Sequence, residues 1–333
     1  MKAIAVFNNK GGVGKTTLLC NLAAFLAKKR GFRVLVVDAD PQCNATQSVL
    51  KPEVVDRIYD KGKDYTLWTF ATPIKSGKGY AEELRYFEAN DFGFGLVAGD
   101  PRMSLLEDLL SADWLTSTAG QERGLRTTLM FSELLSRCAE FDIVFFDMGP
   151  SLGAINRAVL LACDYFVIPA SLDIFTIQAV KNISSALQDW RKKLEIGLGN
   201  IDFDDGDVGA AYAGWRLRFG GYVTQQYTFR RDAHGQKQAV KAYERILKKL
   251  PQSIKTSILK EYEGVLGDPE QYELGSIPYF HSLVPLSQTS NKPIFDLRSA
   301  DGVVGAHFAK VAEFEEVIGE VADSLVARCE LAK

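Results

Sequence analysis

The sequence has few of the residues that build disulfide frameworks or metal cages. Its five cysteines are scattered without a C-x-x-C pair, and its three histidines lack the spacing of metal ligands. An odd, unclustered set of cysteines is typical of reduced thiols and not of a disulfide or zinc framework. We therefore expect a cytoplasmic protein, and the lack of paired cysteines argues against an iron–sulfur carrier.

Long hydrophobic runs are also missing. No apolar stretch reaches the roughly 18 residues of a spanning helix, so we expect no membrane segment. The N-terminal run "MKAIAVF" is too short for a signal peptide. With 47% hydrophobic and 24% charged residues among 333, the composition is that of a globular protein with a sizeable core.

Short β-rich apolar runs alternate with helical patterns along the chain. We predict strands at 2–7, 33–40, 94–100, 141–148, 165–170, 219–227 and 273–279. The helical patterns lie at 15–30, 125–139, 153–163, 173–196, 236–250 and 303–328. This alternation predicts an α/β fold, a doubly wound and mostly parallel sheet with helices on both faces. We expect one domain over residues 1–333, with looped excursions near 51–90 and 197–215.

A glycine-rich loop joins the first predicted strand to the first predicted helix. It reads Lys10, Gly11, Gly12, Val13, Gly14, Lys15, Thr16 and Thr17. The generic phosphate loop begins with a glycine where this chain has Asn9, so the strict pattern fails. Backbone N–H groups and the helix start still favour an anion. We expect Lys15 to contact the β- and γ-phosphates and the Thr16 hydroxyl to bind Mg²⁺.

The run "KGGVGKTT" resembles the deviant Walker motif of the ParA/MinD group of ATPases. The resemblance implies that residues 10–17 bind ATP and that the early lysine, Lys10, is the signature residue. In that family it reaches across a nucleotide-sandwich dimer to the phosphates bound by the partner. The resemblance therefore implies a homodimer in the ATP state. The alternative for Lys10 is a solvated loop lysine.

Acidic residues follow two predicted strands. Asp38 and Asp40 lie two positions apart, so on a strand they share a face. By resemblance, Asp40 positions the attacking water and contacts the Mg²⁺ shell, with Asp38 as its supporting partner. Asp147 ends a strand that fits a Walker B motif, and it would hold Mg²⁺ together with Thr16 and Asp40. The family usually shows Asp-x-Pro-Pro here, whereas this chain has Gly149 before its proline.

Two later segments resemble the family's adenine-binding region. In "GGYVTQQY", Gln225 stands where many relatives have asparagine, and in "GSIPYFHSLVPLSQTSNKPIFDL", Pro278 would lie beside the base. Both patterns are weak taken alone. Together with Lys10, Lys15 and Asp40 as catalytic residues, they complete the predicted ATP and Mg²⁺ site.

A basic segment stands out from an otherwise acidic chain. Between residues 230 and 260, nine lysines and arginines face only two acids, although the net charge of the chain is -3. On a predicted helix over 236–250, one stripe would gather Lys237, Lys241, Arg245, Lys248 and Lys249. The stripe fits non-specific DNA binding through phosphates, or else a solvated helix face.

The last predicted helix is acidic, which does not suit an anionic lipid surface, so we expect no membrane partner. The sequence thus predicts a ParA-like ATPase used in DNA partitioning or cargo positioning. Its hydrolysis is expected to be slow and stimulated by an activator or cargo-adaptor protein. A regulatory scaffold, in which ATP binding gates a partner effector, is the alternative.

Overall fold

The computed structural model describes all residues except 61–63, 201–213, 228, 232–236, 240 and 281. Of residues 226, 227, 229–231, 237–239 and 241–245 it describes the backbone. The acidic run at 200–209, expected to lie in a loop, falls outside the described residues apart from Asn200.

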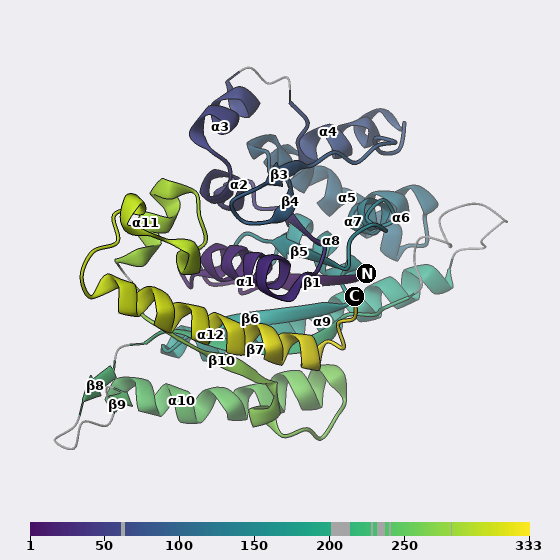
Figure 1. Cartoon of the computed structure of the whole chain (residues 1–333). Coiled ribbons are helices and arrows are strands. Elements are labelled where there is room, and N and C mark those ends of the chain that lie inside the picture. Colours follow the sequence, from purple (N-terminus) through teal and green to yellow (C-terminus); the bar gives the residue numbers. More distant parts are fainter. Residues whose placement is uncertain (61–63, 201–213, 228, 232–236, 240, 281) are drawn as a thin grey trace.

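An eight-stranded sheet forms the centre of the molecule, in the order β10-β7-β6-β1-β5-β2-β4-β3 (Figure 1). Its strands are β1 (Lys2–Val6), β2 (Val34–Asp38), β3 (Phe87–Ala89), β4 (Phe94–Val97), β5 (Ile143–Asp147), β6 (Tyr165–Ser171), β7 (Arg218–Tyr227) and β10 (Glu273–Pro278). Every neighbouring pair is parallel except β3 with β4 at one edge. The predicted mostly parallel sheet is confirmed.

Helices cover both faces of the sheet (Figure 1). They are α1 (Lys15–Arg30), α2 (Asn44–Val49), α3 (Pro52–Tyr59), α4 (Leu67–Ala71), α5 (Glu107–Thr118), α6 (Glu122–Thr128), α7 (Met130–Leu135), α8 (Ala154–Ala162), α9 (Ile174–Gly199), α10 (Lys241–Ser253), α11 (Leu283–Ser290) and α12 (His307–Arg328). Ile4 and Val6 of β1 pack in a core with α1 and α12, whereas Ala3 and Ala5 pack in a second core with α8 and α9. Strands buried on both faces explain the continuous apolar runs of the sequence.

Three regions differ from the sequence prediction, and two of them precede β5. The helix expected over 125–139 is broken at Leu129 into α6 and α7. The segment 51–90, expected as a looped excursion, carries α3, α4, a 3₁₀ turn (Thr72–Ser76) and the edge strand β3. These elements have three to eight residues, too few for a periodic pattern to register.

The helix predicted over 236–250 is wrong at its start. Lys237 lies in β9 (Lys237–Ala239), which pairs antiparallel with β8 (Phe229–Arg231), and α10 begins only at Lys241. The spacing of residues along one segment contains no information on pairing with another segment. The predicted helix therefore began too early in the sequence. The basic stripe is therefore shorter than predicted. Lys248 and Lys249 are exposed on α10, and the side chains of Lys237, Lys241 and Arg245 lie outside the described part of the chain.

Candidate nucleotide-binding site

The central strands end at one level beside the glycine loop. In the parallel register, Val6 of β1 and Asp38 of β2 both pair with Asp147 of β5. The carboxyl ends of parallel strands are where open α/β sheets bind ligands. The register thus brings two of the predicted carboxylates to the point where the loop leaves β1.

The glycine loop ends where α1 begins. Gly12 (φ 71°) and Gly14 (φ 77°) have the left-handed backbone that favours glycine, and Gly14 is the N-cap of α1. The Lys15 side chain curls back into the loop, where its ammonium donates a hydrogen bond to the Lys10 carbonyl at 3.1 Å. Lys15 is only 8% exposed. This is a buried cation in a loop whose free N–H groups favour an anion.

Burial destabilises the charged form of Lys15, and a bound phosphate would stabilise it. Burial lowers the pKa of Lys15, and the charges of Asp147 and Asp40 offset part of that lowering. Both carboxylates are therefore close enough to act on the ammonium. An incoming phosphate would stabilise the same charged form more strongly, because it brings more negative charge.

The predicted metal-binding pair is already joined. The Thr16 hydroxyl donates to Oδ2 of Asp147 at 2.8 Å. Oδ1 of Asp147 is buried and accepts no hydrogen bond from the described residues. Burial raises the pKa of Asp147, and the nearby charge of Asp38 raises it further. A hydroxyl and a buried carboxylate with an unused oxygen fit Mg²⁺, which prefers oxygen ligands.

Asp38 and Asp40 have different surroundings. Oδ2 of Asp38 accepts hydrogen bonds from the N–H and hydroxyl of Thr46 at 2.8 and 2.6 Å, so Asp38 fixes the first turn of α2. Asp40 accepts one from the Gln42 N–H at 3.0 Å. A Cβ built on Gly149 would lie 3.2 Å from Oδ1 of Asp40. The glycine that departs from the family pattern therefore lies directly against the predicted catalytic carboxylate.

Lys10 is held within its own chain. Its ammonium donates to the Ser171 hydroxyl at 2.9 Å and forms an ion pair with Asp173. Asp173 is also the N-cap of α9, where its Oδ1 accepts from the N–H groups of Phe175 and Thr176. The predicted contact of Lys10 with a partner's phosphates stays a prediction, and it requires this ion pair to open.

The two predicted base-binding residues meet in a slot beside the loop. A cavity of about 100 Å³ is lined by Gly14, Thr17, Gln225, Pro278 and seven apolar or aromatic neighbours. Nε2 of Gln225 is buried and donates to none of the described residues. An apolar slot with one unused amide donor matches the needs of a planar base with ring acceptors.

Two comparisons of sequence show where the chain belongs. The model of a family described as an AAA domain matches residues 1–76 and 105–199, more than half of the chain. The chain is a member of the ParA/MinD-type family of P-loop ATPases. Protein IncC of Escherichia coli is 32% identical over 206 residues, which make up 58% of this chain and 47% of IncC.

A second ParA/MinD-type relative is the chromosome-partitioning ATPase Soj of Thermus thermophilus. It is 31% identical over 194 residues, or 58% of this chain and 64% of Soj. The chain thus spans from about half to just under two thirds of the length of these relatives. Among solved structures, protein DIP2308 of Corynebacterium diphtheriae has a TM-score of 0.75 and 29% identity, with 99% of both chains covered.

The sequence did not point to Ser171, Asp173 or Glu107. Glu107 of α5 accepts from the N–H groups of Ala154 and Ile155, and so caps α8 behind the Asp147 strand end. An aspartate before a helical pattern signals a cap, but nothing local connects it to a lysine 163 positions earlier.

In the described part of the chain no helix is long and apolar enough to cross a bilayer.

Proposed function

We propose that this protein is a ParA-like ATPase, a dimerising switch that partitions DNA or positions another cargo. The observation that carries the proposal is the buried Lys15 beside the Thr16–Asp147 pair, in which Oδ1 of Asp147 accepts no hydrogen bond from any residue that the structure describes. The name of Soj, a chromosome-partitioning ATPase, supports the same function. ATP is the proposed substrate, with Gln225 and Pro278 at its base.

The reaction is in-line attack of water on the γ-phosphate of ATP, giving ADP and phosphate. Lys15 neutralises charge on the phosphates, and Asp40 orients the attacking water. Thr16 and Asp147 would hold Mg²⁺, which supplies further positive charge to the phosphate oxygens. Positioning and neutralisation are the main work of a protein in phosphoryl transfer. We expect slow hydrolysis that an activator or adaptor protein stimulates.

Dimerisation would use the surface around Lys10. Directly after Asp173, Ile174 and Phe175 are 59% and 69% exposed. These exposed side chains would give a second copy apolar surface to bury beside the ion pair. Binding of ATP by two copies would draw each Lys10 away from Asp173 and towards the partner's phosphates, because a triphosphate carries more charge than one carboxylate.

Sedimentation of the Asp40→Ala variant tests the switch. We expect a dimer in saturating ATP and a monomer in ADP, because nucleotide binds without being hydrolysed. Asp56→Ala, on the exposed face of α3, is the matched control and should behave like the wild type. Lys10→Ala added to Asp40→Ala should abolish the dimer. A monomeric Asp40→Ala protein in saturating ATP contradicts the proposal.

The shortened basic stripe gives the scaffold alternative a specific observation in its favour. DNA partitioning predicts duplex binding that requires ATP, weakens steeply with salt and weakens further when Lys248 and Lys249 become alanine. An ATP-dependent dimer that binds no duplex DNA at low salt would favour a scaffold that gates a partner effector.

A further inference from the structure

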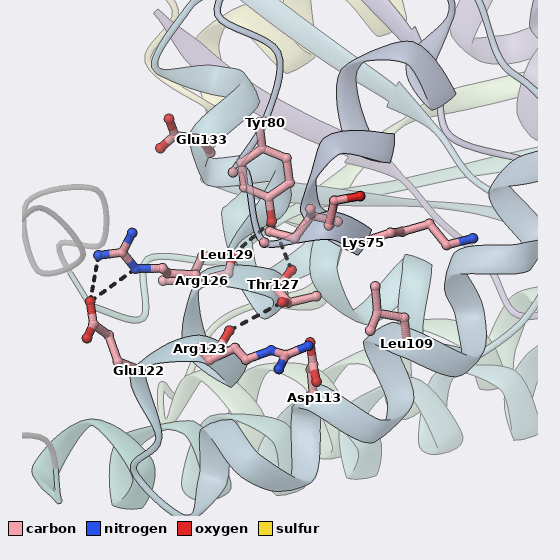
Figure 2. Close-up of a pocket in the computed structure, with 14 residues that line it drawn as sticks. Lys75, Tyr80, Leu109, Asp113, Glu122, Arg123, Arg126, Thr127, Leu129 and Glu133 are labelled. Carbon is pink, nitrogen blue, oxygen red and sulfur yellow. Dashed lines mark hydrogen bonds and ion pairs between the residues drawn. The ribbon is translucent and has the colours of Figure 1, made fainter.

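A large polar cavity lies between the 51–90 segment and the helices α5 and α6 (Figure 2). Its volume is about 930 Å³. One wall runs from Ile74 to Tyr80, and the other comes from α5, α6 and the start of α7. None of the residues that line it belongs to the nucleotide site described above.

Tyr80 fixes the outer wall of this cavity. Its ring stacks on Phe70, with centroids 5.3 Å apart and planes 6° apart. Its hydroxyl donates to the Arg126 carbonyl at 2.9 Å, which ties the wall to α6. Because one residue joins both walls, the cavity is formed before any ligand arrives, which lowers the entropy cost of binding.

Three of the six charged residues that line the cavity are already paired. Arg126 pairs with Glu122 at 2.6 Å, and Arg137 pairs with Glu133 at 2.9 Å. Such i,i+4 pairs neutralise each other locally. They leave little charge for a ligand, so recognition depends on the charges that lack a partner.

The other three charged residues that line the cavity form no ion pair with any residue that the structure describes. Oδ2 of Asp113 is buried and receives no hydrogen bond from the residues that the structure describes. Lys75 lies over the Trp68 ring at 5.0 Å, and neither it nor Arg123 has a described carboxylate within 4.0 Å. Figure 2 shows Asp113 between Arg123 and Leu109, with Lys75 above Leu109. A buried carboxylate oxygen without a donor is costly, so this site favours a cationic group over Asp113.

We infer that this cavity docks a short segment of a partner protein that carries a basic side chain flanked by acidic ones. The basic group would bind Asp113, and the acidic groups would pair with Arg123 and Lys75. Ile74, Leu109 and Leu129 give apolar contact between these charges. A single ion would use one of the three charges and little of the cavity, whereas an extended segment uses all of them.

Part of the outer wall lies outside the segments that the family model matches. The AAA-domain family model matches up to residue 76 and resumes at 105, so Gly77, Gly79 and Tyr80 lie in the unmatched stretch. The charged wall on α5 and α6 lies inside the matched part. Three of the fourteen lining residues thus lie outside the matched part, whereas Lys75, Asp113 and Arg123 lie inside it.

Selection from a displayed library of random heptapeptides tests the inference on the full chain. We expect the peptides enriched on wild-type protein to carry Lys or Arg between Asp or Glu residues. Their dissociation constants, measured by fluorescence anisotropy, should rise at least tenfold for Asp113→Asn and for Arg123→Gln. Added salt should also raise the dissociation constant of the wild-type protein, because it screens the charges. Asp108→Asn, an exposed aspartate on the same helix, is the matched control and should bind like wild type.

The exposed position of Arg123 keeps the test independent of folding, since Arg123→Gln removes no buried contact. Thermal unfolding by circular dichroism checks each variant. Three outcomes overturn the inference: no enrichment, enriched peptides without a basic residue, or peptides that bind both variants as tightly as the wild type. None of these outcomes depends on ATP, so they leave the proposed ATPase function standing.

Discussion

The ammonium of Lys10 lies against the carboxylate of Asp173, a residue 163 positions later that also caps α9. Their side chains are 27% and 36% exposed, so the pair is partly solvated and can exchange partners. The same lysine is the residue proposed to reach across the dimer. In the proposed dimer this ion pair would therefore compete with dimerisation, and its strength would set how much ATP the switch requires.

Asp173→Asn should lower the ATP concentration that gives half-maximal dimerisation. Asparagine keeps the helix cap, because its side-chain oxygen still accepts from the backbone, but it removes the charge that holds Lys10. A partly exposed ion pair contributes about 0 to 1 kcal/mol, so we expect a shift of up to about fivefold. Sedimentation over an ATP titration measures it, best in the Asp40→Ala background.

Asp189→Asn, which breaks an exposed ion pair with Lys193 on the same helix, controls for general effects on α9. An ATP requirement that is the same in both variants would show that the Asp173 carboxylate does not restrain Lys10.

Thr16→Ala should weaken nucleotide binding mainly when Mg²⁺ is present. The variant removes the hydroxyl that lies 2.8 Å from Asp147, and with it one proposed ligand of the metal. We expect the affinity gained on adding Mg²⁺ to fall at least tenfold, or about 1.4 kcal/mol. Titration of a fluorescent ATP analogue with Mg²⁺ or with EDTA measures the difference. Thr16→Ser should keep the gain, and a full gain in the alanine variant would exclude the assignment.

Gly149→Ala should slow hydrolysis and leave nucleotide binding almost unchanged. The new Cβ would lie 3.2 Å from Oδ1 of Asp40, so the carboxylate must move by a few tenths of an ångström. We expect a loss of about tenfold or more in kcat, since small misplacements of positioning groups reduce rates strongly. Gly199→Ala, whose Cβ would meet nothing within 4 Å, is the matched control. Unchanged kcat in Gly149→Ala would separate Asp40 from the chemistry.

Asp100 should make the protein sensitive to acid. Burial opposes its charge, but hydrogen bonds from Arg102 and Thr66 overcome this and hold the pKa of Asp100 below its usual value. Because the folded-state pKa is the lower one, the stabilisation is present above about pH 4 and is lost as the pH falls through the folded pKa. Asp100→Asn should cost about 1 to 3 kcal/mol at pH 7 and little near pH 2.

Urea unfolding from pH 7 to pH 2.5 measures that dependence, with the exposed Asp108→Asn as control. A constant difference between Asp100→Asn and wild type over this range would show that the charge of Asp100 does not stabilise the fold.

The central sheet could be predicted because each of its main strands has a local sequence signal. The runs around Val36 and Phe145 are apolar without interruption, and both are buried central strands in the structure. Lys15, Thr16 and Asp147 could be predicted for a similar reason, since each stands at a strand end or helix start that the sequence marks. The fold dictates that such positions meet.

What the sequence did not reveal depends on contacts between distant segments. The pairing of β9 with β8 overrides a helical pattern that runs through Lys237, and short elements such as β3 exist only through their partner strand. The same holds for Asp173 and for Tyr80, whose roles arise from residues far along the chain. Local patterns carry no information on such contacts.

The level at which Val6, Asp38 and Asp147 meet has a consequence for tolerated insertions. Every residue of β2 and β5 is buried, so sliding either strand by one position would still bury apolar side chains. The same slide would turn a carboxylate to the opposite side of the sheet. A one-residue insertion inside β5 should thus separate Asp147 from Thr16 and remove the proposed Mg²⁺ site, and the misplaced buried carboxylate should also lower stability.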